Sequence, residues 1–115
     1  MADLSVRERQ AGDVTILDMS GEVRIGAGSI ALRDAIGNIA ADGKKKILLN
    51  LAGVSYIDSS GIGELIAKYT TVTRQGGQLK LLNLTDRIQN LLVITKLLTV
   101  FDSYEDEGEA LKSFQ

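Results

Sequence analysis

Residues 47–63 have the sequence ILLNLAGVSYIDSSGIG, and this stretch decides the fold. Its first five residues, Ile47–Leu51, form a continuous aliphatic run, which is typical of a strand buried on both faces. A second short apolar stretch, Val54–Ile57, ends at Asp58–Gly61. Beyond it, apolar residues recur with helical spacing until the glycine pair at 76–77, which ends the predicted helix. The apolar face of that helix consists of Ile62, Leu65, Ile66, Tyr69 and Val72.

Upstream of this stretch, the chain predicts a hairpin followed by a helix. Apolar residues in Leu4–Val6 and Val14–Leu17 flank turn residues at Ala11–Asp13, so we expect two antiparallel strands. Ser29 is predicted to be the N-cap of a helix that ends at Gly43. The apolar stripe of this helix consists of Leu32, Ala35, Ile36, Ile39 and Ala40.

Downstream, the pattern predicts two further strands and two further helices. Leu79–Leu82 is a second buried strand, and Thr85 or Asp86 is expected to cap the helix after it. Leu98–Phe101 returns to a strand pattern. The carboxylates within Asp102–Glu109 then precede a last amphipathic helix, whose N-terminus they would stabilise. That helix would dock through Ala110, Leu111 and Phe114.

Strands and helices alternate along most of the chain, after a hairpin at its start. Such alternation favours a partly parallel sheet with helices packed on it. We therefore expect an α/β fold in which residues 1–115 form a single domain. Its sheet would be mixed and mostly parallel, with about five strands, about four helices and the N-terminal β-hairpin at its edge.

The composition excludes several classes of function. The 115 residues include 13 Lys and Arg and 15 Asp and Glu, and the net charge of −2 gives no field that would attract nucleic acid. There is no Cys and no His, so a Ser-His-Asp triad and a thiolate or imidazole metal site are impossible. We expect no metal and no cofactor. No apolar run approaches the roughly 20 residues of a membrane span, so we expect a cytoplasmic protein without a membrane partner.

The segment Asp58–Gly61 is the one place where the sequence suggests chemistry, and it allows three interpretations. In the first, Ser59 or Ser60 is only a helix N-cap, with Asp58 facing the positive end of the helix dipole and Gly61 and Gly63 allowing close packing. In the second, a serine is the nucleophile of a hydrolase elbow. That motif needs Gly on both sides of the serine and a nearby base, and the chain offers neither.

In the third interpretation, the serine accepts a phosphate. A hydroxyl at the start of a helix faces solvent, and the N–H groups of the first turn would stabilise a phosphate of about −1.5 to −2 charge. The carboxylates of Asp58 and Glu64 lie nearby in the sequence, so the added charge would make a strongly negative surface. A partner that docks there through apolar or acidic groups would then be repelled, which is a switch.

The chain resembles, in order along its length, the bacterial anti-sigma factor antagonists, which are small proteins of the STAS domain family. The strand and DSSG turn within 47–63 look like the phosphorylation region of that family. Leu17–Glu22 is similar to the Gly-Glu turn after its second strand, and Gly76–Leu79 to the entry into its next strand. The pair Leu91–Leu92 together with Leu97–Phe101 resembles its C-terminal part. The resemblance implies a mixed sheet with helices chiefly on one side.

This resemblance also implies a function. In that family the serine directly after the aspartate is phosphorylated by a partner that is both an anti-sigma factor and an ATP-dependent serine kinase, so the acceptor here would be Ser59. The unphosphorylated protein would bind the anti-sigma factor, phosphorylation would release it, and a serine phosphatase would restore binding. The protein itself would not be an enzyme. The residues implied in partner binding are Glu22, Arg24, Asp58, Ser59, Ser60, Gly61, Ile62 and Gly63.

The chain departs from the family pattern at two positions. The family usually has Asp where Arg24 follows Gly21–Val23, and it commonly has Gly where this chain has Lys96. Arg24 would alter the choice of partner or hold a phosphate. The alternative function is a STAS scaffold or adaptor in a larger signalling assembly, in which the serine pair only caps the helix. The sequence predicts neither the sigma factor nor the oligomeric state.

Overall fold

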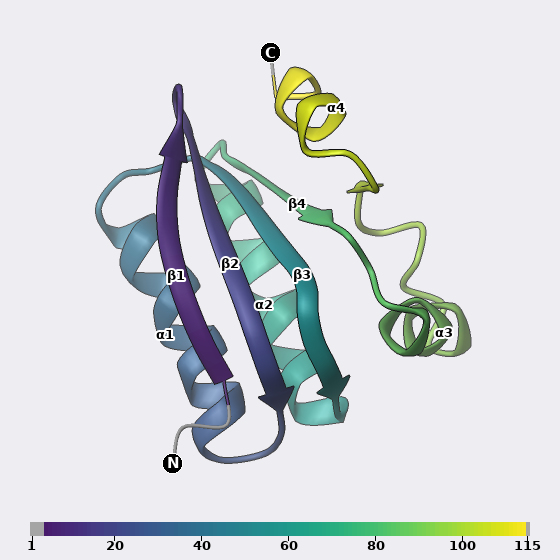
Figure 1. Cartoon of the computed structure of the whole chain (residues 1–115). Helices are drawn as coiled ribbons and strands as arrows, with labels where there is room; N and C mark the ends of the chain where they lie inside the picture. The colour runs from purple at the N-terminus through teal and green to yellow at the C-terminus, as the bar shows by residue number, and fades with distance from the viewer. Residues whose placement is uncertain (1–3, 115) are drawn as a thin grey trace.

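The strands form one mixed sheet in the order β1-β2-β3-β4-β5 (Figure 1). The computed structural model describes residues 4–114. Within them, β1 and β2 pair antiparallel and each later strand runs parallel to its neighbour, which confirms the predicted α/β fold with its N-terminal hairpin. The strands are β1 (Leu4–Ala11), β2 (Val14–Val23), β3 (Lys46–Ile57), β4 (Gln78–Leu82) and β5 (Ser103–Tyr104). The helices are α1 (Ala27–Ala41), α2 (Ser59–Arg74), α3 (Asp86–Ile94) and α4 (Glu107–Lys112).

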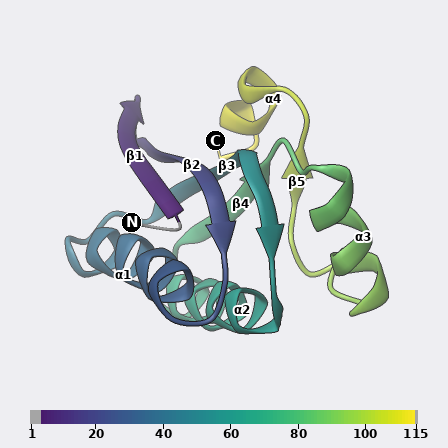
Figure 2. The same cartoon turned by 60° about the horizontal axis from the view of Figure 1, so that its bottom comes forward.

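Apolar side chains are buried on both faces of the sheet. Figure 2 shows α1 and α2 together on one face and α4 on the other. Side chains alternate along β2, so Leu17 and Met19 belong to the large core beneath α1 and α2. Val14 and Ile16 belong to a smaller core on the opposite face, which Phe114 completes directly after α4. The two longest helices therefore share one face, as the family resemblance implied.

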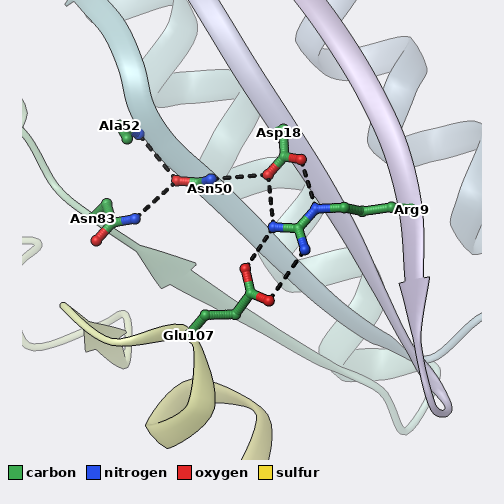
Figure 3. Close-up of polar contacts among 6 residues, drawn as sticks. All are labelled: Arg9, Asp18, Asn50, Ala52, Asn83 and Glu107. Carbon is green, nitrogen blue, oxygen red and sulfur yellow. Dashed lines mark hydrogen bonds and ion pairs between the residues drawn. The ribbon is translucent and has the colours of Figure 1, made fainter.

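The opposite face also carries a network of polar side chains (Figure 3). Arg9 of β1 donates to both carboxylate oxygens of Asp18, at 2.6 and 3.1 Å. It also donates to both oxygens of Glu107 at the start of α4, at 3.1 and 2.5 Å. Asn50 donates to Asp18 at 2.8 Å and accepts from Asn83 at 3.2 Å. The network therefore joins three adjacent strands, the residue after β4 and the start of α4.

Helix α1 begins earlier than predicted, because Gly26 and not Ser29 is its N-cap. Gly26 has a φ of 96°, a conformation that glycine adopts without steric cost. A Cβ on Gly28 would stand 2.7 Å from the carbonyl oxygen of Glu22, so the helix starts directly against the end of β2. Ser29 is consequently buried within the helix, and its hydroxyl donates to the carbonyl of Gly26 at 3.2 Å. The prediction of Ser29 as N-cap is wrong.

The two apolar stretches Ile47–Leu51 and Val54–Ile57 form a single strand of 12 residues, β3. Small residues at its centre allow this continuity. A Cβ on Gly53 would stand 2.7 Å from the Cβ of Ser20 on β2, so the two strands approach closely there. The register between β2 and β3 shifts at this point, between Asp18 and Ser20. This long strand runs from the buried centre of the sheet to the C-terminal end of the parallel strands, where Asp58 follows it.

The predicted strand at Leu98–Phe101 is wrong, because these residues form turns and the strand β5 comes later. After α3 the chain reverses at Lys96, whose φ is 62°. This left-handed conformation favours glycine, which is the residue that the family commonly has there. The ring of Phe101 then packs edge-on against Tyr69 of α2, with 5.0 Å between ring centroids. The apolar residues of this segment are therefore buried by folding onto the core, without pairing as a strand.

The predicted cap of α3 and the predicted acidic start of α4 are confirmed. Thr85 accepts a hydrogen bond from the N–H of Ile88 at 3.4 Å at the start of α3. Asp106 accepts from the N–H of Glu109 at 2.9 Å at the start of α4, and Glu107 also lies in that first turn. Among the helices of residues 4–114, none is long and apolar enough to cross a membrane.

Candidate functional site

The candidate site lies at the end of the sheet where β2 and β3 finish side by side. Val23 and Ile57, the last residues of these parallel strands, are partners in the register. The N–H of Asp58 donates to the carbonyl of Val23 at 3.0 Å, which joins the start of α2 to the end of β2. The loop before α1 and the first turn of α2 therefore meet at the C-terminal ends of β2 and β3 (Figure 2).

Asp58 is the N-cap of α2, and its carboxylate organises both loops. One oxygen accepts from the N–H groups of Ser60 and Gly61, at 3.0 and 3.1 Å, and from the hydroxyl of Ser60 at 2.5 Å. The other accepts from the N–H of Ile25 at 2.9 Å. These bonds hold the pKa of the Asp58 carboxyl below its usual range, and the Ser60 hydroxyl contributes most. The interpretation in which Ser59 or Ser60 is the N-cap is therefore wrong.

The two serines differ in exposure and in bonding. Ser60 is half-buried, and its hydroxyl is bound to Asp58. Ser59 is exposed as the first residue of α2, and among residues 4–114 its hydroxyl has no hydrogen-bond partner. Because Asp58 caps the helix, the Ser59 hydroxyl is not needed as its N-cap.

The next three residues divide between packing and surface. A Cβ on Gly61 would stand 2.6 Å from Val23 and 2.7 Å from Ile57, so only glycine fits between α2 and the two strands. Ile62 is 5% exposed and belongs to the large core, which removes its side chain from any contact with a partner. Gly63 is exposed, and a Cβ there would meet no atom within 4 Å. The predicted close packing therefore holds for Gly61 and is wrong for Gly63.

Arg24 is held over the ring of Tyr56 beside the site. Its guanidinium donates to Glu22 at 2.6 and 3.1 Å and lies 4.2 Å from the centroid of the Tyr56 ring. The Glu22 carboxylate raises the pKa of Arg24. A second guanidinium, that of Arg87 on α3, lies 5.3 Å from the same centroid. The predicted pair Glu22 and Arg24 thus forms a unit with an aromatic ring that the sequence analysis did not select.

A hollow of about 680 Å³ lies between the start of α2 and helix α3. It includes Ser59 and Asp58, and its far wall is α3. Ile94 on that wall is 76% exposed, and Ile25 in the loop after β2 is 80% exposed. The hollow is lined by Tyr56, Ile57, Asp58, Ser59, Arg87, Asn90, Leu91 and Ile94. Its combination of a hydroxyl, a cation and exposed apolar side chains suits the docking of another protein.

Sequence reasoning missed the α3 wall of this hollow. A signal was present: Arg87, Asn90, Leu91 and Ile94 recur at the spacing i, i+3, i+4 and i+7, which places them on one helix face. The same helix also carries an apolar face that packs on the sheet, with Ile88 and Leu92 buried, and that stronger pattern masks the first one. Within residues 4–114, no group of three or more acidic side chains is placed to hold a metal ion.

Comparisons with known proteins agree with this architecture. The STAS domain family model matches residues 5–110. The anti-sigma-B factor antagonist of Bacillus subtilis is 32% identical over 107 residues, which cover 92% of this chain and 96% of that protein. A crystal structure of an anti-sigma factor antagonist from Mycobacterium paratuberculosis has a TM-score of 0.86 and 22% identity, covering 96% of this chain and 93% of that chain.

A further solved structure is that of the Bacillus cell fate determinant SpoIIAA in its phosphorylated form. It has a TM-score of 0.75 and 18% identity, covering 96% of this chain and 100% of that chain. At these identities the two solved structures support the fold alone.

Proposed function

Because the chain belongs to the STAS domain family, we propose that it is an anti-sigma factor antagonist whose binding to its partner is controlled by phosphorylation of Ser59. The relatives that carry this name are regulators, and the protein is likewise a regulator and not an enzyme. It acts in the cytoplasm on an anti-sigma factor with serine kinase activity, and a serine phosphatase reverses the modification. Neither nucleic acid nor a membrane is its direct partner.

The observation that carries this proposal is the difference between the two serines. Of the two serines after Asp58, Ser59 is exposed and its hydroxyl forms no hydrogen bond within residues 4–114, whereas Ser60 is half-buried and bound to Asp58. The Ser59 oxygen would attack the γ-phosphorus of ATP, and the bond from that phosphorus to the β,γ-bridging oxygen would break. ADP leaves, and the hydroxyl proton passes to a base of the kinase. Hydrolysis by the phosphatase restores the hydroxyl and releases inorganic phosphate.

Phosphorylation would change the docking surface through charge. Before it, the surface beside the hollow presents exposed Ile25 and Ile94 to a partner. Afterwards a group of about −1.5 to −2 charge stands next to Asp58 and against the hollow. A partner that buries apolar groups there would have to remove that phosphate from water, and this desolvation is costly. A loss of about 3 kcal/mol lowers affinity roughly 100-fold, which is enough to release the partner.

The test uses two bait variants in extracts of the source bacterium. Ser59→Ala is expected to capture an anti-sigma factor with a kinase domain, identified by mass spectrometry, and Ser59→Asp is expected not to capture it. The captured kinase, purified and supplied with ATP, is expected to add about 80 Da to the wild-type protein and nothing to Ser59→Ala. Ser5→Asp is the matched control, because Ser5 is an exposed serine on the edge strand β1.

Two results would contradict the proposal. Phosphate uptake by Ser59→Ala would assign the modification to another residue. Equal capture of the same partner by Ser59→Ala and Ser59→Asp would show that the hydroxyl is not a switch. Capture of a stable, kinase-free assembly by both baits would favour the alternative function, a STAS scaffold or adaptor.

A further inference from the structure

Two arginines lie near the ring of Tyr56, but they differ in their other contacts. Arg24 is already paired with the carboxylate of Glu22. Arg87 forms no ion pair with any carboxylate within residues 4–114, and its guanidinium lies 5.3 Å from the centroid of the Tyr56 ring. An arginine presents five N–H donors. Those of Arg87 are therefore held beside a neutral ring and not committed to an anion.

The position of Arg87 is also unfavourable for its own helix. It lies in the first turn of α3, where the helix dipole favours a negative side chain and disfavours a cation. Its side chain is exposed and is not needed to fill the core. The positive charge of Arg87 therefore does not stabilise the start of α3, and its guanidinium is free to bind an anion.

Arg87 and Ser59 line the same hollow, Arg87 from α3 and Ser59 from the start of α2. Tyr56 lies in the same lining and restricts the guanidinium, which lowers the entropy lost when the arginine binds an anion. Asp58 does not compete for Arg87, since its oxygens already accept from Ile25, Ser60 and Gly61. Among the residues that line the hollow, Arg87 is the one cation, and it forms no ion pair within residues 4–114.

We propose that Arg87 binds the phosphate of phosphorylated Ser59 and thereby places its side chain across the hollow. A guanidinium binds two phosphate oxygens at once, a geometry that lysine cannot provide. The phosphorylated form then differs from the unmodified form in shape as well as in charge, because the bridge obstructs access to Leu91 and Ile94 on the α3 wall. This inference rests on the proposed phosphorylation of Ser59.

The test installs phosphoserine at position 59 during translation, so it needs no kinase. The second ionisation of the phosphate is followed by phosphorus NMR as the pH is changed. A nearby cation favours the dianion, and an ordinary phosphoserine has its second pKa near about 6. The other charged side chains near Ser59 and Arg87 in the sequence or the fold are Asp58, Glu22, Arg24, Glu64 and Asp86, and they are the same in the parent and in Arg87→Gln. In Arg87→Gln the proton affinity of the phosphate is expected to rise at least about threefold, which is half a pKa unit.

Arg74→Gln is the matched control. It removes the same charge from an exposed arginine in the last turn of α2, about 22 Å along the helix from Ser59. The phosphate of this variant is expected to titrate like that of the parent. A second measurement follows the side-chain Nε–H signal of Arg87, which is expected to move when phosphoserine replaces serine in the otherwise unchanged protein.

Three outcomes would overturn the inference. In the first, the second pKa of the phosphate is the same in Arg87→Gln as in the parent. In the second, Arg74→Gln raises that pKa as much as Arg87→Gln does. In the third, Arg24→Gln raises it and Arg87→Gln does not. The last result would assign the phosphate to Arg24. Because phosphoserine is installed directly, each of these results concerns Arg87 and is independent of whether a kinase modifies Ser59.

Discussion

The polar network of Figure 3 and the loop around Asp58 contain similar side chains but differ in what they leave unpaired. In the network, Arg9 binds both Asp18 and Glu107, while Asn50 donates to Asp18 and accepts from Asn83. Around Asp58, the carboxylate is used by backbone N–H groups, which leaves the neighbouring Ser59 hydroxyl and the Arg87 guanidinium without ionic or hydrogen-bond partners among the described residues.

This difference indicates which side chains are free to bind a partner. A side chain that is already paired within the protein gains little from a ligand, because a new bond replaces an existing one. The network is therefore expected to stabilise the fold and to have no effect on the switch. The loop around Asp58 is expected to control binding and, apart from its packed glycine, to contribute little to stability.

The largest effect is expected where the loop packs on the sheet. Gly61→Ala would force a methyl group to within 2.6 Å of Val23, and overpacking of this kind costs about 1–3 kcal/mol in the free energy of unfolding. Gly63→Ala has open space and is expected to stabilise α2 by up to about 1 kcal/mol. Urea unfolding measures both. Equal effects of the two substitutions would show that the loop is not packed as described.

An intermediate effect is expected in the network. Arg9→Gln removes paired hydrogen bonds to Asp18 and Glu107, and because these side chains are partly exposed the loss is expected to be about 1 kcal/mol. Arg7→Gln is the control, with the same charge change on β1 at a residue with no ion pair among residues 4–114. Both variants are expected to bind the captured partner as the parent does. Weakened binding by Arg9→Gln would break the proposed separation between the two regions.

The smallest effect is a pH dependence of the network. Hydrogen bonds from Arg9, with a further one from Asn50, lower the pKa of Asp18 below its ordinary value of 3.8. A carboxyl with a lowered pKa in the folded state contributes stability above the unfolded pKa and loses it as the pH falls through the folded value. The stability difference between the parent and Asp18→Asn is therefore expected to be constant near neutral pH and to shrink below about pH 4. Urea midpoints across this range measure it, and a difference that grows on acidification would contradict it.

Much of the fold could be predicted from local patterns. The hairpin, the buried strands at 47–51 and 79–82 and the helix after Asp58 follow from apolar periodicity and from glycine. The errors share a cause. At Ser29 and at Leu98–Phe101, the local pattern was compatible with more than one structure, and contacts with distant residues decided between them. Propensity is a weak guide wherever packing competes with it.

The site could be predicted only in part. Its location at DSSG followed from the strand-to-helix transition, and Ser59 was selected through the family resemblance. The contact between Arg87 and Tyr56 could not be predicted, because these residues are 31 positions apart and meet only when α3 is placed beside the end of β3. The resemblance implied Ile62 in partner binding, yet the helix turns its side chain into the core.

The sequence by itself determined the alternation of strands and helices, the absence of His and Cys chemistry and the position of a hydroxyl at the start of a helix. Those features depend on residues close together along the chain, or on composition alone. Only the tertiary structure decided that Asp58 caps α2, that Ser60 is occupied while Ser59 is not, and that a cation of α3 lies across the hollow. Hydrogen bonds and packing between distant segments made those choices, since each depends on a register and a distance that exist only once the sheet has formed.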